Sequence, residues 1–319
     1  MVGKIVLGTR GSELARAQTR LVEEAIRGAH PNVTIETKII ATRGDKAGVV
    51  DPLAGRKGLF TAEIERALLA REVDIAVHSA KDLPSEPRLE VELAAVLPRA
   101  PMDDVLVSKR PGGLNSLPHG AIVATGSVRR RHQLLWKRTD LDIIDLRGNV
   151  PTRLRKLAKN EWDAIVLARA GLERLGMSPT RTEIYFEDAQ FFLEILPREI
   201  FLPAGGQGII AVQVRADDQS TKAVLHAIND RGTLLCLKAE REFLRRLQGD
   251  CNCPVGVLAN IEDGMMKMRA QVFVQGRVAP RQDKIEGAPD DRDRLAAELL
   301  NRLRAPAAAQ GYGLADEHE

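Results

Sequence analysis

The segment with the clearest potential for chemistry is residues 74–84, where an apolar run ends in a charged turn closed by Pro84. The run predicts a buried strand, and Asp82 follows it next to Lys81. In open α/β sheets, ligands bind in the crevice beyond the carboxyl ends of the strands. A single carboxylate at such a place is a candidate proton donor or acceptor. An aspartate that merely organises the turn fits the same residues.

A second candidate site lies where a predicted strand, residues 121–125, leads into a predicted helix, residues 127–137. Backbone N–H groups, the Ser127 hydroxyl and the helix dipole would all face one spot there, which favours an anion. Arg129 and Arg130 add planar guanidinium groups that suit two-point binding of carboxylates or phosphates. A solvated basic helix face is the structural alternative.

Arginine recurs at the ends of other predicted strands. Arg147 and Arg174 follow two further strands of the same unit, and Arg153 lies on the helix after Arg147. Arg10 follows the first strand of the chain, where Ser12 would cap the next helix. Any one of them could simply cap a helix or pair with an acid. Their recurrence in two α/β units favours a polyanionic ligand between these units.

Two loops carry further candidate groups. The long connection over residues 42–60 has little periodicity, so it is either functional or an ordinary solvent loop, and Lys57 and Phe60 at its end could cover a cleft. Cys251 and Cys253 are one residue apart, a spacing that suits neither a zinc site nor a redox pair. A thiolate at this place could be a nucleophile, an attachment point or inert.

Composition narrows the class of protein. A length of 319 residues predicts two or three domains, and three cysteines suit a reducing compartment. We see no run long enough to span a bilayer and no signal peptide, so the sequence predicts a cytoplasmic protein. A net charge of +3 and an aromatic content of 3% argue against a nucleic-acid partner.

The alternation of predicted strands and helices divides the chain into three domains. Residues 1–99 and 199–217 form a first α/β domain with a mostly parallel sheet, to which strand 208–215 returns. Residues 103–195 form a second α/β domain. Residues 218–319, which begin with a long helical stretch through residue 247, form a smaller α+β domain. Two lobes joined by two chain crossings would enclose a cleft.

These segments resemble the porphobilinogen deaminase family over nearly the whole chain. The motifs that carry the resemblance occur in the family's order: Thr9-Arg10-Gly11-Ser12, Thr42-Arg43-Gly44-Asp45, Lys57-Gly58-Leu59-Phe60, residues 78–84, Gly126-Ser127-Val128-Arg129-Arg130, Leu146-Arg147-Gly148-Asn149-Val150, Pro203-Ala204-Gly205-Gly206-Gln207-Gly208 and the loop around Cys251.

The resemblance implies two lobes like those of periplasmic binding proteins around a cleft, followed by a third domain. It implies a cytoplasmic, monomeric transferase of tetrapyrrole synthesis, also called hydroxymethylbilane synthase. Such an enzyme joins four molecules of its substrate porphobilinogen head to tail and releases ammonia each time. The product grows on a dipyrromethane cofactor held by a thioether, for which the position of Cys251 matches. The family does not require a thiol at the position of Cys253.

The resemblance also assigns roles to the candidate residues. Asp82 would assist the loss of ammonia, stabilise the cationic species that form and take part in the final deprotonation. The pyrrole rings carry acetate and propionate groups, which explains the many cations. The residues that would hold these groups are Arg10, Ser12, Ser79, Lys81, Thr125, Ser127, Arg129, Arg130, Arg147, Arg153 and Arg174, with Lys57 and Phe60 in the covering loop.

One departure and two alternatives remain. The family commonly has two lysines before its Leu-Phe pair, whereas this chain has Arg56 and Lys57 in a shorter loop. A non-catalytic two-lobed binding protein or sensor for an organic anion would share the cleft and the arginines, but it would have no use for Asp82 or Cys251. A nucleic-acid binder would use the arginines at 129–131, which the low aromatic content disfavours.

Overall fold

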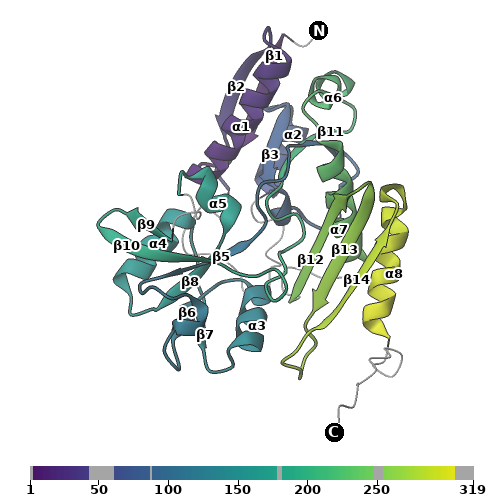
Figure 1. Ribbon diagram of the computed structural model, residues 1–319. Coiled ribbons are helices and arrows are strands. Elements are labelled where there is room, and N and C mark those ends of the chain that lie inside the picture. The colour runs from purple at the N-terminus through teal and green to yellow at the C-terminus, as the bar shows by residue number, and fades with distance from the viewer. Residues whose placement is uncertain (1–2, 43–60, 87, 178–181, 248–253, 306–319) are drawn as a thin grey trace.

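The computed structural model describes residues 3–42, 61–86, 88–177, 182–247 and 254–305 (Figure 1). These residues form a five-stranded, a six-stranded and a three-stranded sheet. The first two sheets belong to two α/β lobes, and the third belongs to a smaller C-terminal domain. The predicted fold class, two α/β lobes and a smaller α+β domain, is confirmed.

The sheet of lobe 1 has the strand order β2-β1-β3-β11-β4. β1 pairs parallel with β2 and β3, whereas β11 pairs antiparallel with β3 and β4. β1, β2, β3 and β4 therefore run in one direction, so the strands of this sheet are mostly parallel as predicted. The exception is β11, which enters the sheet from lobe 2 in the opposite direction. The elements of this lobe are β1 (Lys4–Thr9), α1 (Glu13–Ala29), β2 (Thr34–Ile39), α2 (Ala62–Leu69), β3 (Ile75–Ser79), β4 (Val91–Val96), β11 (Ile210–Arg215) and the short η2 (Ala80–Asp82).

The sheet of lobe 2 has the order β7-β6-β8-β5-β10-β9 and is also mixed. The sequence patterns gave β6, β7 and β8 but missed β5, β9 and β10. The elements are β5 (Asp104–Ser108), η3 (Leu114–Ser116), β6 (Ile122–Ala124), α3 (Val128–Lys137), β7 (Asp142–Ile144), α4 (Val150–Lys159), β8 (Ala164–Ala168), α5 (Arg169–Arg174), β9 (Glu183–Phe186) and β10 (Ala189–Ile195).

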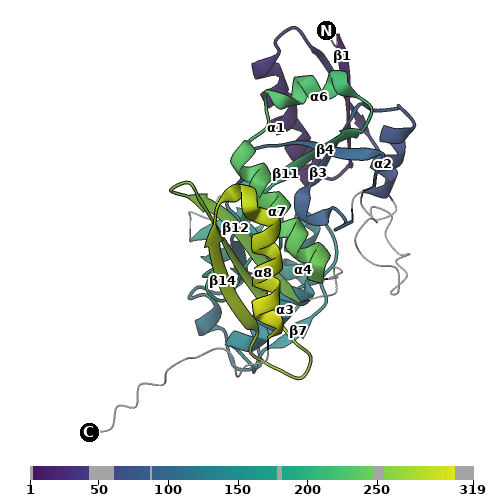
Figure 2. The same cartoon turned by 90° about the vertical axis from the view of Figure 1, so that its right-hand side faces the viewer.

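The C-terminal sheet is an antiparallel meander with two helices on one face (Figure 2). The predicted long helical stretch over residues 221–247 is helical but interrupted. The chain is divided here into α6 and α7. The side chain of Asn229 accepts a hydrogen bond from Val96 N of lobe 1 at 3.1 Å. Asp230 begins a new helix, because its carboxylate accepts from Thr233 N at 2.7 Å. The elements are α6 (Gln219–His226), α7 (Arg231–Leu247), β12 (Val255–Glu262), β13 (Met265–Val272), β14 (Arg281–Gly287), η4 (Pro289–Asp291) and α8 (Arg292–Arg304).

The chain crosses between the two lobes twice, after β4 and again before β11. Both crossings meet α7 at the buried carboxylate of Glu240. It accepts hydrogen bonds from Arg99 Nη1 of the first crossing at 2.6 Å and from Gly206 N of the second at 2.6 Å. The third domain thus packs at the hinge between the lobes. Among the described residues, none of the helices has the length and apolar character needed to cross a membrane.

Candidate active site

A recess of about 420 Å³ lies beyond the carboxyl ends of β1 and β3 in lobe 1. Arg10 and Ser12 come from the turn after β1, where the Ser12 side chain caps α1 as predicted. Ser79 ends β3, and its hydroxyl is 2.8 Å from Nε2 of the buried Gln18 on α1. Asp82 lines the same recess. The structure therefore brings together four of the predicted site residues of this lobe at the carboxyl ends of β1 and β3, namely Arg10, Ser12, Ser79 and Asp82.

Asp82 is placed by a single 3-10 turn, residues 80–82. The turn begins where Ala80 N donates to Ile209 O at 3.0 Å and ends where Leu83 N donates to Ala80 O at 3.2 Å. Gly206 lies against the turn: a Cβ on this residue would be 3.0 Å from the backbone of Ala80 and of Lys81. Its φ of +78° also requires glycine. The second crossing therefore supports the backbone that carries Asp82.

His78 is buried near the end of β3. Burial, and next the positive charge of Arg10, lower the pKa of His78 to about 4. The imidazole is therefore neutral near pH 7, so it adds no charge to the recess.

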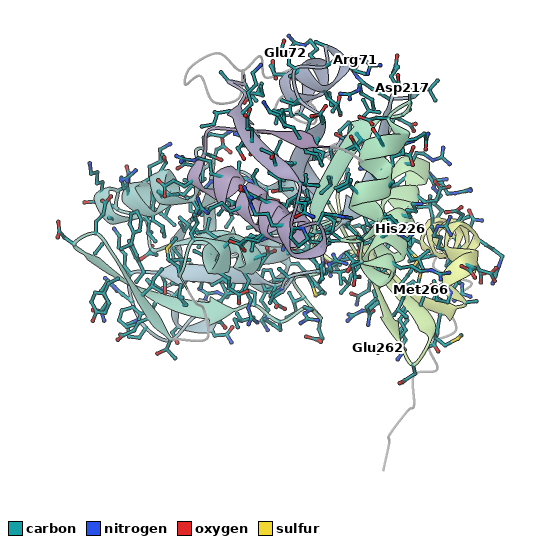
Figure 3. The ribbon with its side chains drawn as sticks, turned by 90° about the horizontal axis from the view of Figure 1, so that it is seen from above. Arg71, Glu72, Asp217, His226, Glu262 and Met266 are labelled. Atoms are coloured by element: carbon teal, nitrogen blue, oxygen red, sulfur yellow. The ribbon has the colours of Figure 1, made fainter. Side chains whose placement is uncertain are left out.

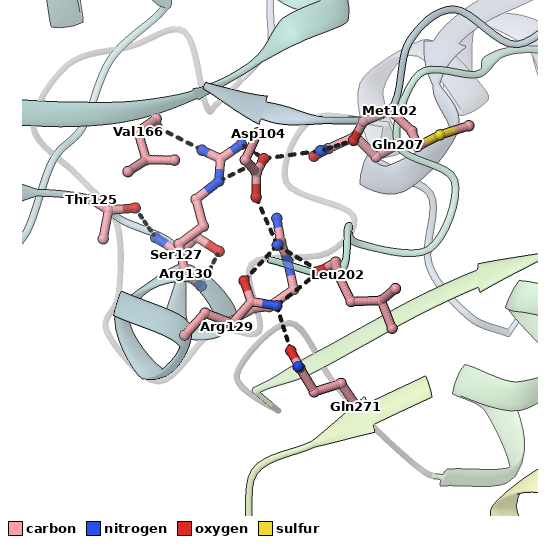
Figure 4. Close-up of polar contacts among 11 residues, drawn as sticks. Met102, Asp104, Thr125, Ser127, Arg129, Arg130, Val166, Leu202, Gln207 and Gln271 are labelled. Carbon is pink, nitrogen blue, oxygen red and sulfur yellow. Dashed lines mark hydrogen bonds and ion pairs between the residues drawn. The ribbon is translucent and has the colours of Figure 1, made fainter. Parts of the chain in front are cut away.

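Arg129 and Arg130 lie in a buried ion cluster and not on a solvated helix face (Figure 4). Asp104 at the start of β5 accepts from Arg129 Nη1 at 2.8 Å and from Arg130 Nη2 at 2.7 Å. Burial opposes ionisation of Asp104, but the two guanidinium groups outweigh it and hold its pKa well below the usual value. Gln207 also donates to Asp104, at 2.9 Å. The cluster thus joins lobe 2 to the second crossing.

The polar residues that begin α3 form a local cap. The Ser127 hydroxyl accepts from Arg130 N at 3.4 Å, and Thr125 Oγ1 accepts from Ser127 N at 3.3 Å. The Arg129 guanidinium, in addition to its ion pair, donates to Leu202 O at 2.8 Å. The N-terminus of α3 is therefore tied to the second crossing, and these bonds already use two of its N–H groups.

Lys81 and Asp82 of lobe 1 lie close enough to Arg130 and Arg153 of lobe 2 for their charges to interact, which is consistent with the predicted cleft between the lobes. Burial and then Arg130 lower the pKa of Lys81 to about 8, while Asp82 opposes the shift. Burial and then Arg130 also lower the pKa of Arg153 to about 10, again opposed by Asp82. Lys81 and Asp82 of lobe 1 therefore share one electrostatic environment with Arg130 and Arg153 of lobe 2. Burial is the larger cause of both shifts and the neighbouring cation adds to it, so a cleft at this place would suit an anionic ligand.

The remaining predicted arginines lie nearby but have local partners. Arg147 forms an exposed ion pair with Asp145 at 2.6 Å, and Arg153 Nε donates to Gly148 O at 2.7 Å. Arg174 Nη2 donates to Gly208 O of the second crossing at 2.6 Å. Burial lowers the pKa of Arg174 to about 10. These contacts hold the guanidinium groups in place. Each contact uses one nitrogen of its guanidinium group.

Four predicted residues, Lys57, Phe60, Cys251 and Cys253, lie outside the described residues. The segment with the two cysteines is bounded by the end of α7 and the start of β12. Val257 N of β12 donates to Pro203 O at 3.0 Å, so this strand is fixed to the second crossing. Within the described ranges, no cluster of His, Cys, Asp or Glu could hold a metal ion.

Sequence reasoning assigned no role to Asp104, Gln18, Gln207 or Glu240. For Asp104, the one local signal was the acidic pair Asp103 and Asp104 just before a short apolar run. Gln207 was noted only as part of the motif at residues 203–208. Gln18 and Glu240 gave no local signal, because their partners are distant in sequence.

The donor set of the cleft fits a dipyrromethane carrying several carboxylates. The described groups that face it are guanidinium, ammonium, hydroxyl and amide groups, with Asp82 as the acid in the recess. Guanidinium groups bind carboxylates in two-point fashion, and hydroxyl and amide N–H groups add neutral donors. Such a cleft can hold a polyanion and bring one carboxylate to the reacting atoms.

Comparison with known proteins gives consistent matches. Family models described as "Porphobilinogen deaminase, dipyromethane cofactor binding domain" and "Porphobilinogen deaminase, C-terminal domain" match residues 5–223 and 234–305. Porphobilinogen deaminase of Roseiflexus sp. (strain RS-1) is 44% identical over 303 residues, covering 94% of this chain and 95% of that protein. The protein of the same name from Roseiflexus castenholzii is 46% identical over 307 residues, covering 95% and 96%.

Among solved structures, the methionine-binding protein MetQ is similar with a TM-score of 0.43 and 12% identity, covering 73% of this chain and 92% of that chain. This likeness is too weak to support an inference. The two family models, in contrast, span both lobes and most of the third domain.

Proposed function

The chain belongs to the porphobilinogen deaminase family, and from this premise we propose how its own residues serve the reaction. The protein is a transferase, a hydroxymethylbilane synthase, which condenses porphobilinogen with release of ammonia. Its cofactor is dipyrromethane, which supplies the pyrrole carbon at which the product chain starts. The roles of individual residues, given below, are our proposal.

The observation that carries the proposal is the position of Asp82, the carboxylate in a recess beside a cleft lined with cations from both lobes. Loss of ammonia from the aminomethyl group of porphobilinogen leaves a cation. A fixed carboxylate next to that group stabilises the developing positive charge. The same carboxylate can accept the proton that the pyrrole carbon loses after the new bond forms. Asp82 therefore acts as the catalytic acid and base.

Cationic and hydroxyl groups would bind the acetate and propionate groups. Arg10, Ser12 and Ser79 provide them in the recess, next to Asp82. Each desolvated charge-assisted hydrogen bond of this kind contributes about 1.5–3 kcal/mol. The further residues proposed to bind cofactor or substrate are Lys81, Thr125, Ser127, Arg129, Arg130, Arg147, Arg153 and Arg174, with Lys57 and Phe60 in the covering loop.

The buried cluster refines two of these assignments. Arg129 and Arg130 already share Asp104, so a carboxylate ligand would bind only through their remaining N–H groups. We infer that Arg130 lies nearer the ligand than Arg129. Arg130 lowers the pKa of both Lys81 and Arg153, whereas the guanidinium of Arg129 donates to Leu202 O.

Cys251 is the proposed attachment residue for the cofactor. Its support is the family match, its position in the sequence and the fixing of β12 to the second crossing, next to the cleft. We also propose the domain division 1–99 with 199–217, 103–195 and 218–319, a cytoplasmic location and a monomeric state.

Intact-mass measurement of the purified holoprotein tests the attachment. We expect the mass to exceed that of the polypeptide by one dipyrromethane. The addition should disappear in Cys251→Ser and persist in Cys253→Ser, the matched control. An addition that is lost only in Cys253→Ser would move the attachment site. A bare polypeptide mass that persists after exposure to porphobilinogen would contradict the proposal and favour a non-catalytic binding protein.

A further inference from the structure

The turn that carries Asp82 has little rigidity of its own. It is one 3-10 turn closed by a single hydrogen bond of 3.2 Å, from Leu83 N to Ala80 O. Such a short turn has poor hydrogen-bond geometry and does not hold its place without outside contacts. The position of Asp82 is therefore set by the elements packed around the turn.

Helix α7 of the third domain supplies two of these contacts from one face. Leu237 is fully buried in a cluster with Ala80 and Leu83, the residues that flank the catalytic pair. Arg241, one helical turn further on, donates from Nη2 to Pro84 O at 2.8 Å. Residues four apart lie on the same side of a helix. This face of α7 thus contacts both the beginning and the exit of the turn.

Two acids lie near the guanidinium of Arg241. It lies in the field of Glu65, which is buried on α2, and of Glu86, which follows the turn. Burial lowers the pKa of Arg241, and the two carboxylates oppose the shift. Burying the charged guanidinium of Arg241 costs free energy. Such a cost is expected where the bond from the guanidinium to Pro84 O has to keep a fixed geometry.

The opposite side of α7 belongs to the core of the third domain. Cys236, Ala239 and Phe243 pack there against the meander. The helix ends at Leu247, four positions before Cys251 in the sequence. One rigid helix therefore connects the catalytic turn of lobe 1 with the domain that contains the attachment cysteine.

We propose that Arg241 is a positioning residue for the reaction: through Pro84 O it fixes the Asp82 turn relative to the third domain. Arg241 does not touch the substrate and acts through Asp82. The inference rests on the proposed role of Asp82. A displacement of the carboxylate by about 1 Å is enough to lower the rate up to about a hundredfold, because proton transfer requires close alignment.

A double-mutant cycle tests this coupling. In the holoenzyme, Arg241→Met should lower kcat by about tenfold or more, change KM by less than about threefold and keep the covalent adduct. In an Asp82→Asn background, the same change should lower the residual kcat by less than about twofold, because no carboxylate remains to be positioned. Equal losses in both backgrounds, or full kcat in Arg241→Met, would overturn the proposal.

Two further variants separate positioning from folding. Arg245→Met is the matched control, because Arg245 lies on the same helix but pairs with Glu242 at the surface, so its kcat should stay unchanged. Arg241→Lys keeps the charge and a donor, so it should recover most of kcat; failure to do so counts against the proposal. If Arg241→Met does not fold, the cycle is measured with Arg241→Gln, and equal losses of kcat in the native and Asp82→Asn backgrounds again overturn the proposal.

The two failures are distinguishable. Near-normal turnover in Asp82→Asn alone would remove the proposed catalytic role of Asp82. A strongly impaired Asp82→Asn enzyme with additive loss on Arg241→Met would leave that catalytic role intact and remove only the positioning role of Arg241.

Discussion

Oδ1 of Asp104 lies 2.7 Å from Nη2 of Arg130, and both side chains are buried. Because Asp104 also neutralises Arg129, Asp104→Asn would leave two buried guanidinium groups without their shared anion. We expect the free energy of unfolding to fall by about 3–5 kcal/mol, as measured by urea denaturation.

The matched control for this prediction is Asp217→Asn. Asp217 pairs with Arg71 on the exposed surface, at 2.8 Å, and both residues are labelled in Figure 3. Removing an exposed pair should cost less than about 1 kcal/mol. Similar losses in the two variants would show that the buried cluster adds no special stability.

Gly206→Ala should impair both stability and turnover. The new Cβ would be 3.0 Å from the backbone at Ala80 and Lys81, and φ is +78°. Gly264 has a similar φ of +76° but open space around it, so Gly264→Ala separates backbone strain from contact with the turn. Both variants should lose about 1 kcal/mol or more of stability, and only Gly206→Ala should lose kcat. An unchanged kcat in Gly206→Ala would show that the second crossing does not help to position Asp82.

Stability should depend on pH through His78. Its pKa is about 4 in the folded protein, against an ordinary value of 6.5. Between these values the unfolded chain binds a proton that the folded protein does not, so this contribution to stability falls as the pH falls from about 6.5 towards about 4. The loss between about pH 7 and about pH 5 should be about 2 kcal/mol and should be absent in His78→Gln. Urea denaturation at both pH values checks this, and the same pH dependence in both proteins would contradict it.

Binding of porphobilinogen should weaken at alkaline pH through Lys81. Burial and then Arg130 lower its pKa to about 8, so Lys81 loses its positive charge as the pH rises through this value. We expect KM to rise between about pH 7 and about pH 9 in the native enzyme. In Lys81→Arg, where the side chain stays charged, KM should rise less over the same range. Equal pH dependence of KM in the two enzymes would exclude this role for Lys81.

The sequence predicted most of the elements that place the site, because their signals are local. Ser12 caps α1 as expected, and the apolar run before Asp82 is β3. The mixed sheets were not predictable in the same way: strand direction depends on where the chain returns, and β11 enters its sheet from the other lobe. The end of α6 near Asn229 depends likewise on a partner in lobe 1.

The candidate site follows the same division. Sequence motifs identified Asp82, Arg10 and Ser79, which the fold brings to one recess. The burial of Arg130 could not be predicted, because its counter-ion, Asp104, is 26 residues away and begins a strand that the patterns missed. Similarly, nothing local to Arg241 indicates that it reaches Pro84.

The turnover of Asp82→Asn tests the central claim most directly. The amide keeps the size of the side chain but cannot exchange the proton or carry the negative charge. The account predicts that the variant keeps the covalent adduct by intact mass and the stability of the native enzyme, while release of ammonia from porphobilinogen slows by roughly 10²–10⁴. Turnover within a few fold of the native rate, with the adduct in place, would contradict the assignment of Asp82.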